Sequence, residues 1–200
     1  ASVLDVLLIQ VRKHRIRLKL SEKVRKIEKC VDNWAVFTDT WHYTCDGVIL
    51  CCGSKAAPVT GSDGSGYQLA ASLGHTVLPV LPALTALRTK DPLAAACEGT
   101  RCQAVVELCR IGRNTRELLA RDQGELQWTR DGISGIPVFQ VSRYAAQALA
   151  GQERLEVVLD LLPCMRAQEL SGMLMYLRET DPGASVQDIL AGLLPKKLIL

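Results

Sequence analysis

The sequence predicts an α+β protein made of two units, and three observations support this prediction. Short apolar stretches with a period of two, typical of strands, alternate with stretches that repeat every three to four residues, as helices do. The 200 residues are enough for one domain or two small ones. An apolar run over residues 76–84 contains two prolines, which favour edges and bends. We therefore expect one unit at residues 1–78 and a second at residues 79–200.

The first unit is expected to begin with a helix followed by strands. Apolar residues recur at helical spacing from Val3 to about His14, and Ser2 is placed to cap this helix. Residues 16–20 alternate between apolar and basic side chains, which predicts a short half-buried strand. Three segments rich in β-branched and aromatic residues come next and predict an antiparallel meander. They are residues 23–30, 33–38 and 41–45.

The stretch from Asp46 to His75 reads as a strand, a glycine-rich loop and a helix. Gly47–Cys51 is apolar throughout, so we expect a strand buried on both faces in a parallel sheet. A helix is expected over Tyr67–Leu73, closed by Gly74. Small residues let a ligand approach the backbone, and the start of a helix favours an anionic group, which is the chemistry of a nucleotide site. The loop glycines are Gly53, Gly61, Gly64 and Gly66.

The glycine spacing by itself does not identify the nucleotide. The loop lacks the Lys-Ser/Thr ending of a Walker A motif, and a GxGxxG after a first strand is absent. A plain turn explains the spacing about as well as a phosphate-binding loop does.

The second unit is expected to be a small antiparallel β-barrel or sheet with helices, and to contain the better hydrophobic core of the two units. Residues 131–137 read as a loop that leads into a helix over Pro137–Ala150. A further helix is expected over Ser171–Leu177, and another begins at Ser185 with Asp188 in the capping-box position. The candidate strands are residues 84–89, 103–110, 117–121, 125–129 and 155–160.

Composition argues against several classes of protein. The 24 basic and 21 acidic residues are too evenly balanced to indicate nucleic acid or a membrane surface as a partner. No apolar run reaches the roughly 20 residues of a membrane span, and no signal peptide is recognisable. The eight cysteines have neither CxxC nor zinc-like spacing, so we expect no metal site and reduced thiols in a cytoplasmic protein. A disulfide scaffold is the alternative.

Several motifs occur in a characteristic order along the chain. Residues 49–54 read ILCCGS and are followed by Pro58, and residues 60–67 read TGSDGSGY. Residues 124–137 read GELQWTRDGISGIP, with Ser142-Arg143 after them. This order resembles the NAD(P)/FAD-dependent oxidoreductases of bacteria, a flavoprotein family that includes aminoacetone oxidase-like enzymes.

The resemblance implies a fold, a cofactor and a set of site residues. Residues 1–78 would be part of a glutathione-reductase-like FAD domain, and residues 79–200 its inserted substrate-side domain. Val24 would meet the adenine side of FAD through its backbone, while Cys52, Gly53, Thr60 and Gly61 would line the dinucleotide. FAD would perform the redox chemistry on an unidentified small-molecule substrate, with use of NAD(P)H left open. No catalytic acid or base can be named.

The chain also departs from the pattern of this family. The family's GxGxxG segment and its C-terminal FAD segment are not found in these residues, and Cys51-Cys52 and Ser54 replace the usual Ala-Thr and second glycine. We therefore expect an internal fragment, the central portion of an FAD-dependent oxidoreductase, that neither holds FAD nor is active alone. The alternative is a non-catalytic or degenerate module that folds without flavin.

Overall fold

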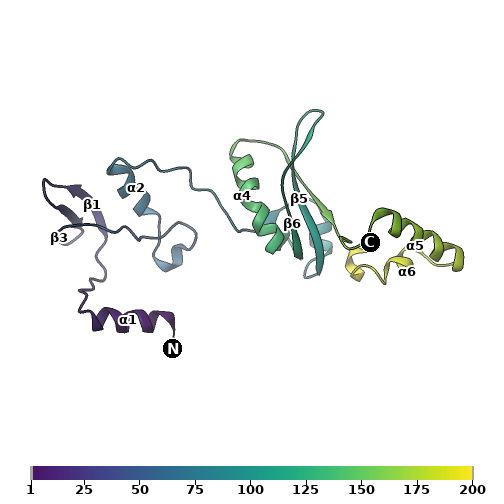
Figure 1. Cartoon of the computed structure of the whole chain (residues 1–200), viewed down its shortest axis with the longest axis horizontal. Coiled ribbons are helices and arrows are strands. Elements are labelled where there is room, and N and C mark those ends of the chain that lie inside the picture. Colours follow the sequence, from purple (N-terminus) through teal and green to yellow (C-terminus); the bar gives the residue numbers. More distant parts are fainter. Residues whose placement is uncertain (1, 200) are drawn as a thin grey trace. The chain divides into compact units, whose positions relative to one another are not determined.

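The computed structural model describes residues 2–199, and the chain divides into two compact units, residues 1–79 and residues 80–200 (Figure 1). Both units mix helices and strands, which confirms the α+β class. The first contains α1 (Val3–Lys13), β1 (Val24–Lys29), β2 (Trp34–Thr38), β3 (His42–Cys45), η1 (Pro58–Thr60) and α2 (Ser65–Ser72). The second contains β4 (Leu87–Arg88), α3 (Leu93–Ala96), β5 (Arg101–Ile111), β6 (Arg116–Thr129), β7 (Gly132–Gly135), α4 (Ile136–Ala150), β8 (Leu155–Asp160), α5 (Ala167–Thr180), α6 (Val186–Leu190) and η2 (Lys196–Leu198).

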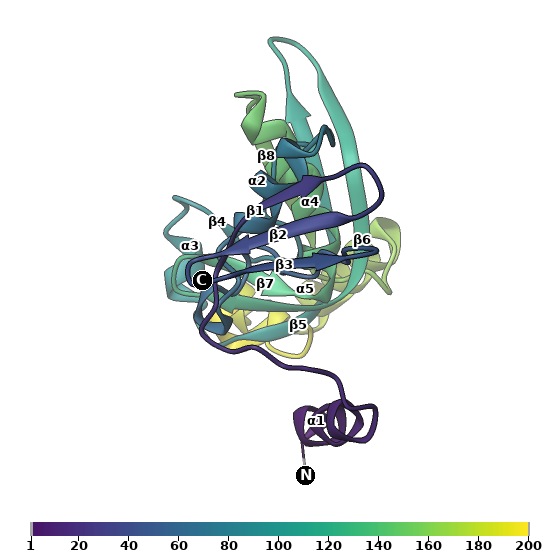
Figure 2. The same cartoon turned by 90° about the vertical axis from the view of Figure 1, so that its left-hand side faces the viewer.

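Strands β1, β2 and β3 form the predicted antiparallel meander, in that order across a three-stranded sheet (Figure 2). Each of the two turns between them is closed by a backbone hydrogen bond. Cys30 N–H donates to the Asn33 carbonyl oxygen at 2.8 Å, and Thr38 N–H donates to the Trp41 carbonyl oxygen at 2.8 Å. Ile27 is the buried member of β1. β1 lies at the edge of this sheet, so one side of its backbone is not used by β2.

Helix α1 is held by its own cap rather than by packing. The Ser2 hydroxyl accepts from the backbone N–H of Asp5, and the Asp5 carboxylate accepts from the backbone N–H of Ser2 at 2.8 Å, a complete capping box. None of the helix residues is buried, and Leu7 is 57% exposed. The helix prediction is confirmed, and its apolar face has no cover within residues 2–199.

Two strand predictions in the first unit are wrong. Residues 16–20 and residues 47–51 have no regular secondary structure, and Ile49 is 89% exposed. A strand that is apolar on both faces, as predicted for residues 47–51, needs other elements to cover both faces of its sheet. No strand among the described residues pairs with either segment, so neither segment is part of a sheet.

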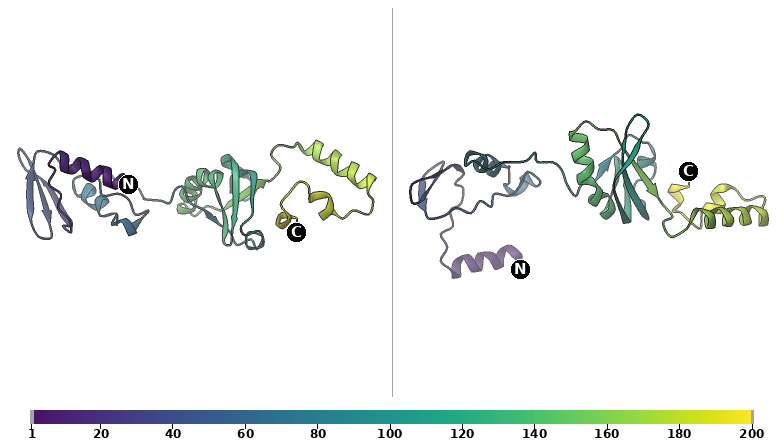
Figure 3. Two further views of the ribbon diagram at one scale, coloured as in Figure 1. Left: turned by 90° about the horizontal axis from the view of Figure 1, so that it is seen from below. Right: turned by 45° about the horizontal axis from the view of Figure 1, so that its top comes forward.

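The second unit is built on an open, curled, five-stranded antiparallel sheet in the order β4-β7-β6-β5-β8. Helix α4 packs on β5 and β6. Figure 3 shows this helix, in green, beside the strands of the sheet. Predicted strand 155–160 matches β8, while the predicted strands 117–121 and 125–129 are parts of the single strand β6. The predicted strand at 84–89 is reduced to Leu87–Arg88.

The segment 131–137, predicted to be a loop, contains the strand β7. A Cβ on Gly132 would lie 2.0 Å from the Leu87 carbonyl oxygen, and one on Gly135 would lie 2.3 Å from that of Glu125. Both glycines also have positive φ, +158° and +105°. Glycine is therefore needed here because neighbouring strands approach the backbone closely, and not because the chain turns freely.

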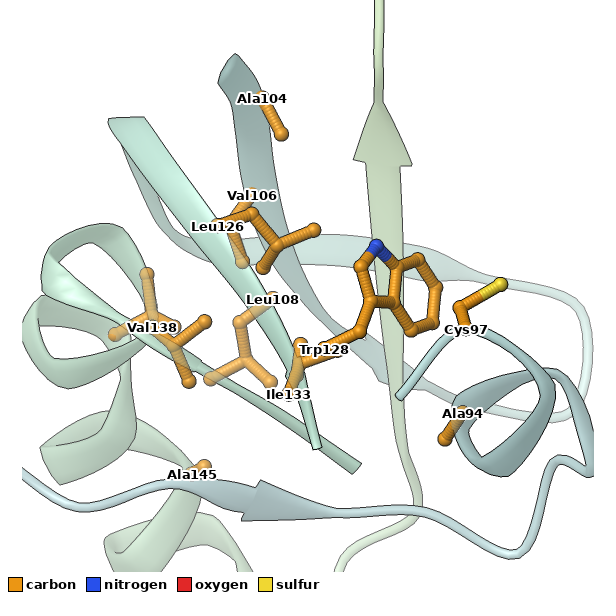
Figure 4. Close-up of a cluster of buried hydrophobic side chains, with 11 residues drawn as sticks. Ala94, Cys97, Ala104, Val106, Leu108, Leu126, Trp128, Ile133, Val138 and Ala145 are labelled. Atoms are coloured by element: carbon orange, nitrogen blue, oxygen red, sulfur yellow. The ribbon is translucent and has the colours of Figure 1, made fainter. Parts of the chain in front are cut away.

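The hydrophobic core lies in the second unit, as predicted. Its buried side chains come from β5, β6, β7, α3 and α4 and converge between the sheet and the helices (Figure 4). Leu126 and Val138 are 0% exposed, and Trp128 is 4% exposed. Ser142, also buried, donates to the Phe139 carbonyl oxygen at 2.7 Å and accepts from Thr85 N–H at 3.2 Å. Ser142 therefore ties the segment before β4 to α4.

The helices after β8 follow their predicted signals. Helix α5 extends the predicted Ser171–Leu177 at both ends, and α6 starts at the predicted Ser185 cap, whose hydroxyl accepts from Asp188 N–H at 3.2 Å. In residues 2–199 no helix combines the length and the apolar character needed to cross a membrane.

Candidate functional site

A cleft of about 520 Å³ lies in the first unit between β1 and the start of α2. Val24, predicted to face a nucleotide, lines it from β1. The opposite wall comes from Gly64, Ser65 and Leu69 at the start of α2. The cleft exists because β1 is an edge strand, so its outer side is open to α2 instead of to a fourth strand.

Four cationic side chains line this cleft, and three of them are paired with carboxylates. Lys23 Nζ lies 2.6 Å from Asp63 Oδ2, Arg25 pairs with Asp39, and Lys26 pairs with Glu28. Lys55 also lines the cleft and belongs to no ion pair among the described side chains. The cleft therefore offers cations to a ligand, together with the single carboxylate of Asp63.

Asp63 organises the loop before α2. Its Oδ1 accepts from the backbone N–H of Ser65 at 2.9 Å, while its other oxygen bonds to Lys23. The hydrogen bond from Lys23, and those from Ser65, hold the pKa of Asp63 well below its ordinary value. Asp63 is therefore an anion that connects the loop to β1 across 40 residues of sequence.

The predicted residues Cys52, Gly53 and Thr60 gather on the same loop. A Cβ on Gly53, whose φ is +72°, would lie 2.9 Å from the Ser62 Cβ. A Cβ on Gly66 would lie 3.0 Å from the Cys52 Cβ. The hydroxyls of Thr60 and Ser62 are 3.1 Å apart. Segment 52–53 thus packs directly on the loop that opens α2.

The remaining predicted residues have different surroundings. Gly61 ends η1 with φ +88° and has open space where a Cβ would stand. Val24 lies on the cleft, whereas Cys52, Gly53, Thr60 and Gly61 are not part of its lining. The structure brings Cys52, Gly53 and Thr60 together and places Val24 in the neighbouring cleft.

The charged residues of the cleft were not singled out from the sequence. Lys23 directly precedes Val24, Asp63 lies between the loop glycines, and Lys55 lies in the preceding loop. The sequence does place charged residues next to Val24 and within the glycine loop, both of which were predicted to contact the nucleotide. Such charges are a usable signal because a nucleotide needs partners for its phosphates and hydroxyls. The pairing of Lys23 with Asp63 could not be read from sequence spacing.

Residues 2–199 contain no group of three or more His, Cys, Asp or Glu side chains placed to hold a metal ion. All eight cysteines are free, including Cys51 and Cys52. Trp128 Nε1 in the second unit is fully buried with no hydrogen-bond partner among these residues.

Comparison with known proteins gives a decisive match to the second unit. The family of the HI0933-like protein barrel and H2TH domain matches residues 81–200. The chain belongs to this HI0933-like family. The match covers the antiparallel sheet, α4 and the helices that follow β8. The expectation of a flavoprotein-type oxidoreductase family is thereby confirmed at this level.

Curated relatives of this HI0933-like chain extend over both units. A 3-dehydro-bile acid delta(4,6)-reductase of Clostridium scindens is 40% identical over 199 residues, 100% of the chain and 48% of the relative. Ribosomal RNA dihydrouridine synthases of Haemophilus influenzae and Escherichia coli are each 25% identical, over 98% of the chain and 46% of the relative. The chain therefore spans about half the length of the curated relatives it matches.

Proposed function

We propose that this chain is part of an FAD-dependent reductase, and that the β1–α2 cleft faces one portion of the flavin dinucleotide. The observation that carries the proposal is the cationic lining of this cleft next to Val24. Lysine and arginine side chains are the usual partners of phosphates, and a free strand edge offers backbone groups to a base. The HI0933-like membership adds independent support for a flavin.

The residues present fit a portion of FAD. Lys55, which has no carboxylate partner in the described chain, would supply a free cation for a phosphate. Gly53, Gly61 and Gly64 adopt positive φ and have no side chain, so a ligand can approach the backbone of the loop closely at these positions. Asp63 would accept hydrogen bonds from ribose hydroxyls. A cleft of about 520 Å³ suits part of a dinucleotide rather than all of it.

Bound FAD would supply hydride transfer, and the chain's own residues would bind and orient it. Lys23 would hold the Asp63 carboxylate in place, and Asp63 would keep the start of α2 fixed through Ser65 N–H. The exposed apolar segment Val48–Leu50 lies directly before Cys51-Cys52. We propose that this segment becomes a parallel strand of a glutathione-reductase-like sheet in the longer protein, where neighbouring strands can cover it.

The names of the relatives suggest which reaction the flavin serves. A delta(4,6)-reductase acts on carbon–carbon double bonds, and dihydrouridine is uridine with its 5,6 double bond reduced. In a 3-oxo steroid and in uracil alike, such a double bond is conjugated with a carbonyl group, which makes it electrophilic toward hydride. We propose that this protein likewise reduces a carbonyl-conjugated double bond, with NAD(P)H as the electron source.

Flavin content tests the proposal. The natural gene product that contains this chain is purified and titrated with FAD, alone and as the variants Lys55→Glu and Lys90→Glu. Lys55→Glu places a carboxylate in the cleft and is expected to weaken FAD binding by about tenfold or more. Lys90→Glu makes the same charge change in the second unit and should leave binding unchanged. The 200-residue chain alone is expected to bind no FAD.

One result would favour the non-catalytic alternative. If the natural gene product is colourless and takes up no FAD, the chain belongs to a degenerate module and not to a reductase. Gly53→Val is the poorer test, because the close approach of Ser62 and the positive φ of Gly53 make this variant strained whether or not flavin binds.

A further inference from the structure

An apolar pocket of about 280 Å³ lies in the second unit, apart from the β1–α2 cleft in the first unit. Its walls come from three places that are distant in sequence: Cys102 and Gln103 at the start of β5, residues 161–165 after β8, and residues 193–195 before η2. Cys102 and Leu161 also pack against the hydrophobic core. The pocket therefore has a rigid base.

Hydrogen bonds fix the two turns that form the other walls. After β8, Leu162 N–H donates to Asp160 Oδ1 at 3.0 Å, and Met165 N–H to the Leu162 carbonyl oxygen at 3.0 Å. Before η2, Leu193 N–H donates to the Leu190 carbonyl oxygen at 2.9 Å. The apolar side chains of both turns are half-buried and line the pocket.

The segment after α6 is also anchored to the end of α3. The Cys97 thiol donates to the Lys197 carbonyl oxygen at 3.1 Å, and Lys197 Nζ donates to the Glu98 carbonyl oxygen at 2.7 Å. Leu198 packs against the core. The wall formed by residues 193–195 is therefore preformed.

The lining chemistry is apolar and uncharged. Leucine, proline and methionine side chains dominate it, with two thiols and the Gln103 amide, and no Asp, Glu, Lys or Arg of the described residues lines it. Burial raises the pKa of the Cys102 thiol, consistent with an environment that disfavours charge. A ligand held here would be hydrocarbon where it touches the walls.

The charge of the second unit argues against a polyanion. Basic and acidic residues are equal in number in residues 80–200, so this unit carries no net formal charge. The arginines of β5 and β6 are paired: Arg101 with Glu125 at 3.2 Å, Arg110 with Glu117 at 2.9 Å, and Arg121 with Glu107 at 3.1 Å. The arginines of these two strands are therefore not free to form a phosphate-binding patch.

From these observations we infer that the pocket formed by β5 and by residues 161–165 and 193–195 binds the hydrocarbon body of an alicyclic, lipid-like enone. This inference rests on the proposed reductase function and names its substrate class. Gln103 lies at this pocket and would donate its amide N–H to a carbonyl oxygen of the ligand. Because no Lys or Arg of the described residues lines the pocket, we do not expect it to bind a substrate through its phosphates.

Binding of a steroid dienone to the 200-residue chain tests the inference. Androsta-4,6-diene-3,17-dione is the probe, and equilibrium dialysis measures its Kd and stoichiometry. One molecule is expected to bind per chain, saturably. Leu194→Glu places a charge in the pocket and should weaken binding by about tenfold or more. Met175→Glu, on an exposed position of α5 outside this pocket, should leave Kd unchanged.

A chemical footprint locates the bound probe. Cys164 is exposed and lines the pocket, whereas Cys30 is exposed in the first unit. Saturating dienone should slow the alkylation of Cys164 by iodoacetamide, measured by mass spectrometry, and leave that of Cys30 unchanged. If Leu194→Glu fails to fold by circular dichroism, Cys164→Trp fills the exposed mouth instead and should weaken binding in the same way.

Three results would overturn the inference: no saturable dienone binding, binding that survives both pocket variants, or protection of Cys164 by a uridine-rich single-stranded RNA and not by dienone. The test is independent of flavin. A colourless natural gene product would defeat the reductase proposal while leaving the dienone result intact, and a yellow product whose chain ignores the dienone would defeat only the present inference.

Discussion

The two units of this chain use a similar content of apolar residues in opposite ways. In residues 80–200 the apolar side chains of five strands and α4 close around Leu126 and Val138, which are 0% exposed. Among the described residues up to Pro79, Ile27 and Leu69 are the only buried hydrophobics, while Leu7 and Ile49 are 57% and 89% exposed. Residues 80–200 contain a complete core, and the described residues of 1–79 do not.

The difference shows what makes an apolar segment fold. The strands of the second unit find partners within the same unit, and β5, β6 and β7 pack against α4. The apolar helix α1 and segment 47–51 have suitable sequences but no partner among the described residues. Stability in the second unit therefore comes from packing, and in α1 from local hydrogen bonds. Four predictions test this contrast, from the largest expected effect to the smallest.

The largest effect is expected from Gly135→Ala. The new Cβ would stand 2.3 Å from the Glu125 carbonyl oxygen at a φ of +105°. Parting β6 from β7 and straining the backbone should lower the free energy of unfolding by about 3 kcal/mol or more. Chemical denaturation followed by circular dichroism measures this. Gly192→Ala, with nothing within 4 Å of its Cβ position, is the control and should be near neutral.

Leu126→Ala should come next, because it removes a side chain at the centre of the core. The expected loss of unfolding free energy is about 2–5 kcal/mol, measured by urea denaturation. Leu118, 53% exposed on the same strand, is the matched site, and Leu118→Ala should cost about 0.5 kcal/mol or less. Equal losses at the two positions would mean that the core of residues 80–200 does not determine stability.

Ser2→Ala should act only on α1. Losing the cap costs a helix about 1 kcal/mol, and since α1 buries none of its residues, packing cannot compensate. Amide hydrogen exchange should therefore accelerate along α1 and stay unchanged in α4. Ser2→Thr keeps a hydroxyl and should preserve most of the protection. Unchanged exchange in Ser2→Ala would show that α1 is held by contacts beyond its cap.

The smallest effect concerns pH and Asp63. Its pKa is lowered by the hydrogen bond from Lys23, so its contribution to the loop is present above the ordinary carboxyl pKa of about 3.9 and is lost as pH falls below it. Lys23→Met should move the pKa of Asp63 upward toward the ordinary value, as NMR titration of the side-chain carboxyl can measure. Lys19→Met, outside the cleft, should leave it in place.

Local signals in the sequence predicted much of this fold. Ser2 and Ser185 begin helices because a hydroxyl two to three residues before a free N–H group is a local interaction. The meander and β8 follow from alternation and turn residues. Glycine was the main source of error. The predicted strands 117–121 and 125–129 are one strand, β6, which runs through Gly124, and the glycine-containing segment 131–137, predicted to be a loop, contains β7.

The candidate site was accessible to sequence reasoning only in part. Segment 52–53 and Thr60 were chosen from a linear motif, and the structure groups them around Ser62. The Lys23–Asp63 pair joins residues 40 positions apart, which depends on how α2 returns to β1. Spacing carries no information on such a contact. Whether these residues bind FAD stays a prediction.

The ends of the five-stranded sheet have a consequence for self-association. The edge strand β4 has only two residues, and a short edge offers little template for another chain. The opposite edge, β8, is six residues long and carries Glu156 and Asp160, with Glu156 paired to Arg116 at 3.3 Å. Charges along an edge disfavour the addition of a further strand. An open sheet can thus expose both of its edges in concentrated solution without promoting amyloid-like stacking.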